Sequence, residues 1–196
     1  MAKILLNRIN KSFDDKPVLV NFSAVIPTGQ ISGLMAPSGE GKTTLLRILM
    51  GLEHPDSGDI ENLDPQSIRT MFQEDRLASH LDPIANLRLT RPDLSRALIQ
   101  KDLESFGLQD CLHQRAGTLS GGQKRRVALL RALESTGSIL ILDEPFKGLD
   151  EETKKRVMEE TKKRINGRTV LLVSHDPKEM TGMGVQHLLP PLKQDE

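Results

Sequence analysis

A glycine-containing segment between an apolar stretch and a helical pattern carries residue types that bind phosphate. The segment reads, in order, Ala36, Pro37, Ser38, Gly39, Glu40, Gly41, Lys42, Thr43 and Thr44. Backbone N–H groups and the positive end of a helix hold phosphates in such a loop. We expect Lys42 to reach the β- and γ-phosphates and the Thr43 hydroxyl to ligate Mg²⁺. The other candidate contacts in this phosphate-binding loop are Ser38, Gly39, Gly41 and Thr44.

Ala36 stands where this loop pattern expects glycine. If the position requires a positive φ, alanine costs about 1 kcal/mol of backbone strain. Gly39 and Gly41 still provide conformational freedom to the loop. The alternative interpretation of the segment is a glycine-containing turn before a helix, with no role in nucleotide binding.

Two acidic residues, Asp143 and Glu144, directly follow the apolar run of residues 139–142. The carboxyl ends of parallel strands form the edge of a sheet where ligands usually bind. We expect Asp143 to hold Mg²⁺ through water and Glu144 to polarise an attacking water molecule. The alternative is a solvated acidic turn, which leaves unexplained why the charges follow a buried strand.

A third motif, residues 119–123, has the sequence Leu-Ser-Gly-Gly-Gln and leads into a basic helical stretch. Ser120 is a good helix N-cap, and the glycines allow a phosphate to approach the N–H groups. The motif therefore predicts a second helix start that binds an anion. Taken alone, it fits a plain N-cap, and the basic residues after it fit a solvated helix face or a nucleic-acid patch.

The elements that must position these groups alternate between strands and helices. Short strands are predicted at residues 3–8, 18–26 and 30–35, as a small antiparallel layer that leads into a core strand. Apolar residues at helical spacing follow from Gly41. Two continuous apolar runs, 139–142 and 170–173, the second entered through Thr169, suit buried parallel strands, with the charged helix at about 150–165 as the crossover between them.

Residues 74–135 have a different sequence pattern, with short helical stretches at about 93–106 and 120–134 and little strand signal. The predicted fold is therefore α/β: a P-loop NTPase core with a parallel sheet, a small N-terminal antiparallel β layer and an inserted helical lobe. Residues 1–73 and 136–196 are expected to form the nucleotide-binding core. Residues 74–135 are expected to form the lobe that carries the third motif.

Composition excludes several classes of function. The 196 residues contain 27 Lys and Arg against 27 Asp and Glu, so no net positive charge favours non-specific nucleic-acid binding, and no nucleic-acid partner is expected. The longest apolar runs have four residues, far below the ~20 of a membrane span. One cysteine, Cys111, excludes an internal disulfide, and the first residues lack an apolar signal-peptide core, which favours the cytosol.

The order of these motifs along nearly the whole chain resembles the ATP-binding subunits of ABC transporters. In that family the sequence of residues 119–123 is the signature motif. The resemblance implies that Gln73 is the Q-loop glutamine, which links Mg²⁺ and water to the helical lobe. It also implies that His175 contacts the γ-phosphate as the switch histidine, and that Phe13 stacks on adenine; simple packing in the antiparallel layer is the alternative for Phe13.

The resemblance also implies a partner subunit. The signature of one subunit, including Ser120 and Gly122, closes over the ATP of another, so a homodimer or a paired ATPase subunit is expected. Residues 148–150 resemble the D-loop, with Asp150 at the shared site, although Lys147 departs from the small residue usual before it. A separate transmembrane permease is implied, with this chain peripheral at the cytoplasmic face of the membrane. Residues 73–77 resemble importers for nitrate, sulfonate, taurine or thiamine-like solutes.

Three other functions compete with this interpretation. A small P-loop kinase fits the length but has no reason to contain the signature sequence. A non-transport ABC ATPase usually has a long coiled coil or two cassettes, and no heptads occur between Thr43 and Leu119. A nucleotide-binding regulator that no longer hydrolyses ATP is the third, and Ala36 is its best support.

Overall fold

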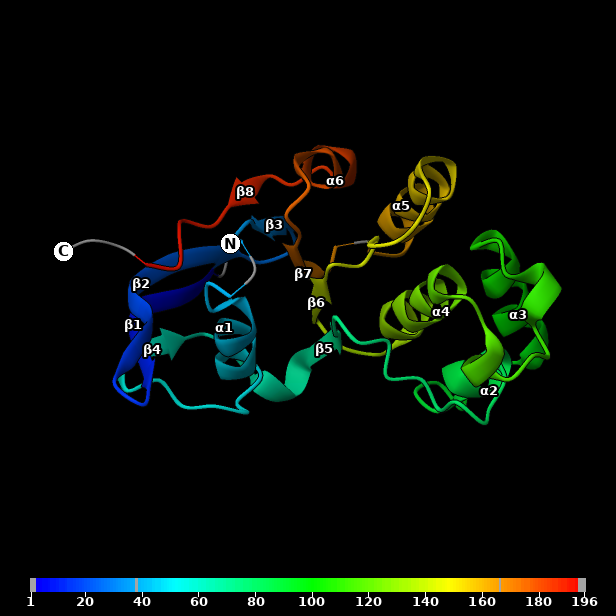
Figure 1. Cartoon of the computed structure of the whole chain (residues 1–196), viewed down its shortest axis with the longest axis horizontal. Helices are drawn as coiled ribbons and strands as arrows, with labels where there is room; N and C mark the ends of the chain where they lie inside the picture. The colour runs from blue at the N-terminus through cyan, green and yellow to red at the C-terminus, as the bar shows by residue number, and fades with distance from the viewer. Residues whose placement is uncertain (1–2, 38, 166, 194–196) are drawn as a thin grey trace. The chain divides into compact units, whose positions relative to one another are not determined.

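The computed structural model describes residues 3–37, 39–165 and 167–193 (Figure 1), so the phosphate-contact prediction for Ser38 lies outside the described residues. The chain forms two compact units. The first unit contains Met1–Ile68 and Gly167–Glu196, and the second contains Arg69–Asn166. Each unit is described in turn.

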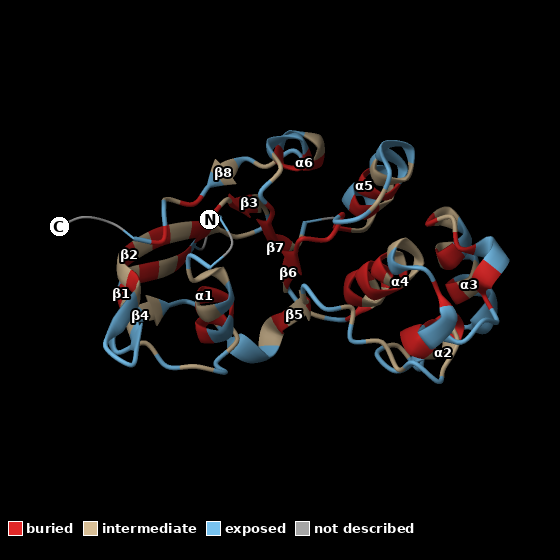
Figure 2. Cartoon of the chain, in the orientation of Figure 1, coloured by how far each residue is buried: buried red, intermediate tan, exposed pale blue. Residues whose placement is uncertain are grey.

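The N-terminal part of the first unit is an antiparallel sheet. Its strands are β1 (Lys3–Phe13), β2 (Lys16–Pro27) and β4 (Ser57–Glu61), in the order β2-β1-β4. Buried and more exposed residues alternate along β1 and β2, as the banded colours of Figure 2 show, because successive side chains point to opposite faces. Asp14 and Asp15, with φ of 47° and 59°, make the two-residue turn between these strands.

Parallel strands form the core of the first unit. Strand β3 (Ile31–Leu34) lies between β7 (Thr169–Val173) and β8 (His187–Leu188), parallel to both. Every residue of β7 is buried, as its continuous apolar sequence predicts. Helix α1 (Lys42–Leu49) follows β3, and α6 (Pro177–Met183) follows β7.

The second unit combines two strands with most of the helices. Strands β5 (Ile68–Met71), at the unit boundary, and β6 (Ile139–Asp143) are neighbours in the parallel sheet. The helices are α2 (Pro83–Arg88), α3 (Arg96–Ser105), α4 (Gly121–Glu134) and α5 (Glu151–Ile165). Short 3-10 turns lie at Gln109–Cys111 and Ala116–Thr118, and a further one in the first unit at Pro65–Ser67. Helix α4 contacts α2, α3 and α5.

The predicted α/β fold is confirmed: parallel strands, a small antiparallel sheet and a group of helices are all present. Strands β4, β5 and β8 were not predicted. Strand β4 has four exposed residues among its five, so it lacks the apolar alternation that sequence analysis detects. It is a strand because β1 provides backbone partners for it.

The two compact units do not coincide with the predicted domains. Strand β6 and helix α5 belong to the second unit, in which both contact α4. Packing therefore groups them with the helices, although they were assigned to the nucleotide-binding core. The functional division into a core of residues 1–73 and 136–196 and a lobe of residues 74–135 stays a prediction.

Candidate functional site

The candidate phosphate-binding loop connects β3 to α1 in the first unit. Gly41 precedes α1 with φ of 102°, and Gly39 has φ of 85°, both in the region that favours glycine. A Cβ on Gly41 would lie 2.8 Å from Cγ1 of Val18, so β2 lies directly against the loop. The chain therefore turns sharply into a helix whose first N–H groups have no partners within the helix.

The ammonium group of Lys42 lies over this loop. Its Nζ donates hydrogen bonds to the carbonyl oxygens of Ala36 and Pro37, the second at 2.8 Å. Thr43 is exposed at the start of α1, and Thr44 is partly buried beside it. A positive charge, a hydroxyl and backbone N–H groups without partners inside the helix are thus together at one helix start, which is the chemistry that binds phosphate.

The backbone at Ala36 is not left-handed. Among the residues that the structure describes, those other than glycine with positive φ do not include Ala36. The side chain is 5% exposed. The strain expected if this position required positive φ therefore does not arise, and alanine fits the loop.

His175 lies at the same edge of the parallel strands as the phosphate-binding loop. Val173, the last residue of β7, is paired with Leu34, the last residue of β3. The Ser174 N–H donates to the carbonyl of Leu34 at 3.3 Å, so the chains remain adjacent as they leave the strands. His175 is exposed one residue later. The register of two strands distant in sequence therefore positions the histidine and the loop on one side of the first unit.

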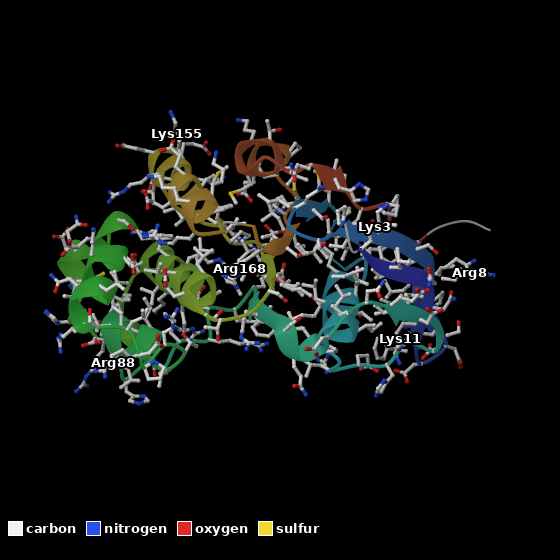
Figure 3. The ribbon with its side chains drawn as sticks, turned by 180° about the vertical axis from the view of Figure 1, so that it is seen from behind. Lys3, Arg8, Lys11, Arg88, Lys155 and Arg168 are labelled. Carbon is white, nitrogen blue, oxygen red and sulfur yellow. The ribbon has the colours of Figure 1, made fainter. Side chains whose placement is uncertain are left out.

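Phe13 ends β1 and is 45% exposed, so it is not part of the packed antiparallel layer. The Nζ atom of Lys11 lies 5.2 Å from its ring centroid. Lys11, labelled in Figure 3, also forms ion pairs of 3.0 Å with Glu53 and Asp56, which hold the ammonium group in place. An exposed aromatic ring is available to stack on a base.

Asp143 and Glu144 lie where β6 ends, in the second unit. Both are buried, at 7% exposure, as expected for groups inside a site and not for a solvated turn. Glu144 has φ of 51°, although left-handed backbone costs a residue with a Cβ on the order of 1 kcal/mol. Such strain is concentrated at functional sites. The left-handed turn directs the chain away from the strand immediately after Asp143.

The predicted N-cap of the signature helix is present. Ser120 Oγ accepts from the Gln123 N–H at 3.2 Å, and the Gln123 side chain accepts from the Ser120 N–H at 2.9 Å, which is a capping box. A Cβ on Gly121 would meet nothing within 4 Å, whereas one on Gly122 would touch Leu149. Gly121 therefore presents open backbone, and Gly122 packs on the segment that contains Asp150.

Asp150 begins α5. Its Oδ1 accepts from the Thr153 N–H at 2.9 Å, and this backbone hydrogen bond lowers the pKa of the Asp150 carboxyl. The side chain is exposed beside Gly148, which has φ of 76°. Asp150 therefore acts as a helix N-cap, and it remains accessible to a partner.

Gln73 follows β5 and its side chain is exposed. Its carbonyl accepts from Arg125 Nη1 at 2.8 Å, and Asp75 Oδ1 accepts from the same nitrogen at 3.0 Å. Arg125 belongs to the basic stretch for which a solvated face or a nucleic-acid patch was considered. Two further arginines of this stretch, Arg126 and Arg131, also donate to backbone carbonyls of the second unit. The arginines of α4 therefore form hydrogen bonds within the second unit that stabilise it.

Sequence analysis did not single out Arg125. The signal that identifies it is helical spacing, because Arg125, Leu129 and Leu133 recur every four residues and all three are buried in α4. An arginine on the apolar face of a helix requires partners that neutralise it and accept its hydrogen bonds.

The predicted site residues fall into two sets. Phe13, His175 and the loop residues lie in the first unit, and the other predicted residues lie in the second. The second set is Gln73, Ser120, Gly122, Asp143, Glu144 and Asp150.

The donor atoms fit Mg²⁺. Thr43, Asp143 and Gln73 offer hydroxyl, carboxylate and amide oxygens, and Mg²⁺ prefers oxygen ligands. Among the described residues there is no group of three or more His, Cys, Asp or Glu that could hold a metal ion.

Comparison with known proteins shows one family. The sequence pattern described as ABC transporter matches residues 19–147. The chain is 39% identical over 180 residues to the aliphatic sulfonates import ATP-binding protein SsuB 3 of Rhodococcus jostii (strain RHA1), covering 90% of this chain and 66% of that protein. It is 37% identical over 194 residues to the aliphatic sulfonates import ATP-binding protein SsuB of Escherichia coli (strain K12), covering 95% and 76%.

A solved structure gives the same answer. The putative ABC transporter ATP-binding protein of Pyrococcus furiosus superposes with a TM-score of 0.77 at 26% identity, covering 89% of this chain and 92% of that one. The chain belongs to the ABC transporter family. It is an ATP-binding, ATP-hydrolysing subunit of the kind that powers transport through a separate membrane-spanning partner. No helix within the described ranges is both long and apolar enough to cross a membrane.

Proposed function

We propose that this subunit hydrolyses Mg·ATP to drive the import of aliphatic sulfonates, bound to its permease at the cytoplasmic face of the membrane. Two observations support this solute. The relatives from Rhodococcus jostii and Escherichia coli are both aliphatic sulfonates import proteins. Residues 73–77 also have the sequence that resembles importers of sulfonate-like solutes.

In the proposed site, Lys42 and the N–H groups at the start of α1 hold the phosphates of ATP. Gly39 and Gly41 provide the turn, Ser38 and Thr44 make further phosphate contacts, and Phe13 stacks on adenine. Thr43, Gln73 and Asp143 are the oxygen donors for Mg²⁺, which neutralises charge on the phosphates when it is bound. When ATP binds, the Lys42 ammonium group exchanges its hydrogen bonds to the carbonyls of Ala36 and Pro37 for a charge-assisted contact with a phosphate.

Glu144 is the proposed general base. A carboxylate at the end of a buried strand can accept a proton from the attacking water. His175 and Gln73 assist by contacting the γ-phosphate and by positioning the water, respectively. The core of residues 1–73 and 136–196 binds the nucleotide, and the lobe of residues 74–135 contacts the permease.

Two subunits are required in this proposal. Ser120, Gly122 and Asp150 complete the site of a partner subunit, since open backbone at Gly121 and an exposed Asp150 carboxylate face solvent within this chain. The start of α4 is a helix N-terminus with a serine cap, and it suits the γ-phosphate of a nucleotide held elsewhere.

The observation that carries the proposal is the register of β3 and β7. Pairing Leu34 with Val173 brings the phosphate-binding loop and His175 to one edge of the sheet, the edge at which α/β proteins bind ligands. A plain turn before a helix does not require a histidine from another strand at that edge.

The test compares two variants with the wild-type chain. Lys42→Ala should weaken ATP binding at least tenfold, because it removes a charge-assisted contact. Glu144→Gln should keep ATP binding and lose turnover. Calorimetric titration and steady-state ATPase rates measure the two effects, and sulfonate uptake into vesicles with the co-purified permease tests the solute. An ATPase rate for Glu144→Gln equal to that of wild type would remove Glu144 from the mechanism.

A further inference from the structure

Arg125 is a buried cation at the centre of the second unit. Its side chain is 5% exposed, and it projects from α4. The ends of both strands of the unit converge on it. Nη1 donates to the carbonyls of Phe72 and Gln73 at 3.0 and 2.8 Å, and Nη2 donates to the carbonyls of Asp143 and Glu144 at 2.5 and 2.6 Å.

The charge of Arg125 is neutralised from one side. Asp75 Oδ1 lies 3.0 Å from Nη1, and the Asp75 side chain is only 26% exposed. One guanidinium therefore satisfies four carbonyl oxygens and one carboxylate, which uses its planar fork of five N–H donors nearly in full. No other protein side chain presents so many donors in a fixed geometry, so lysine cannot replace it.

The Glu144 carbonyl receives two of these hydrogen bonds, from Nε at 3.1 Å and from Nη2. Glu144 is the residue with left-handed backbone, at φ of 51°. A residue with a Cβ persists in that conformation only when surrounding contacts over-determine it. Because the carbonyl belongs to the peptide that follows the Glu144 Cα, holding it restricts the direction of the Glu144 side chain.

We propose that Arg125 is the positioning residue for the general base: it holds Glu144 in its left-handed conformation and, through the Gln73 carbonyl, ties the start of the Q-loop to the same point. Arg125 contacts neither nucleotide nor water in this role. The inference rests on the proposed function of Glu144. In this role Arg125, a side chain of the signature helix, fixes the backbone of the general base and the start of the Q-loop relative to each other.

The opposing explanation is that Arg125 only stabilises the fold. A residue with that role lowers the folded fraction but leaves each folded site with the normal kcat. A positioning residue lowers kcat per site and leaves the KM for ATP nearly unchanged, since the phosphate contacts are made by other residues. A displacement of about 1 Å in a catalytic group costs up to a hundredfold in rate.

The experiment measures kcat and KM for Arg125→Lys and Arg125→Gln in the full chain, with binding sites counted by ATP titration so that misfolded molecules do not contribute. Arg164→Lys is the matched control, because Arg164 is also a mostly buried arginine of the second unit, pairing with Glu160 and Asp102. We expect kcat per site to fall by roughly tenfold to a hundredfold in both Arg125 variants. The control should keep the wild-type kcat and KM.

A double-mutant cycle separates this inference from the proposed function. If Arg125 acts through Glu144, Arg125→Lys should change the residual rate of Glu144→Gln by less than about twofold, because the base is already absent. A wild-type kcat per site in both Arg125 variants, or an equal fold-loss with and without the Glu144 carboxylate, would overturn the positioning role. A fully active Glu144→Gln variant would instead refute the assignment of Glu144 as the base.

Discussion

Val18 leaves no room for a side chain at Gly41: a Cβ on Gly41 would lie 2.8 Å from Cγ1 of Val18 and 3.0 Å from its carbonyl oxygen. Strand β2 therefore packs directly behind the end of the candidate phosphate-binding loop. The contact explains why glycine is required at this position in addition to its φ of 102°. It also links the antiparallel sheet, which carries Phe13, to the start of α1.

Gly41→Ala should therefore distort the loop. The added methyl group meets both unfavourable φ and the backbone of β2, so we expect ATP binding to weaken about tenfold and the free energy of unfolding to fall by about 2 kcal/mol or more. Calorimetric titration and urea unfolding measure the two quantities.

Gly39→Ala is the matched comparison. Gly39 also has positive φ, but a Cβ there would meet nothing within 4 Å. Only the backbone cost of about 1 kcal/mol should remain. Equal losses of stability in the two variants would mean that the contact with Val18 has no energetic weight.

Ala36→Gly should bring no gain in ATP affinity. The backbone at Ala36 is not left-handed, and its side chain is buried, so glycine relieves no strain and adds freedom to the unfolded chain. We expect a loss of stability of about 0.5–1 kcal/mol and ATP binding equal to or weaker than that of wild type. Clearly tighter binding in a calorimetric titration would show that this loop is strained after all.

Mixing two inactive variants should restore ATPase activity if two subunits share each site. Ser120→Arg places a bulky side chain at the signature cap, and Lys42→Ala removes the loop ammonium. In the mixed dimer, one site carries both changes and the other carries neither. The restored rate should rise with protein concentration as dimers form.

Wild-type activity provides the control for this prediction. Its specific activity should also increase with concentration around the dimerisation constant. A specific activity that stays constant from well below to well above that constant would assign hydrolysis to the monomer.

Low pH should weaken the contact between Lys11 and Asp56. The hydrogen bond from Lys11, with a second from the Ser12 N–H, holds the pKa of the Asp56 carboxyl below its ordinary value. A lowered pKa in the folded state contributes stability at pH values above the unfolded pKa, and that contribution is lost as the pH falls through the folded pKa. Asp56→Asn should therefore lower the urea midpoint at pH 7 and have a progressively smaller effect below about pH 4.

One result would contradict this predicted pH dependence. If the difference in urea midpoint between Asp56→Asn and wild type is the same at pH 7 and at pH 3.5, ionisation of Asp56 plays no part in it. Asp59→Asn, which affects a carboxylate bonded to Asn7 and not to a cation, serves as the control.

The motifs were readable from sequence because each depends on local chemistry. Gly41 with Lys42 at a helix start, Ser120 three residues before Gln123, and Asp143 after an apolar run all lie within short segments whose spacing determines their conformation. The order of these segments identified the family, and the buried strands β6 and β7 were detectable as continuous apolar runs.

Other features depended on contacts between residues far apart in the chain. Strand β4 forms because β1 provides its backbone hydrogen-bond partners. His175 lies at the same sheet edge as the loop because of the register of β7 with β3. The backbone of Ala36 avoids positive φ because of the conformation of its loop. Arg125 looked like one of several solvated basic residues. Helical spacing aligns Arg125 with the buried Leu129 and Leu133, but only the tertiary structure showed which groups satisfy it. Those carbonyls and that carboxylate come from positions 18 to 53 residues away, and no local pattern encodes partners at that distance.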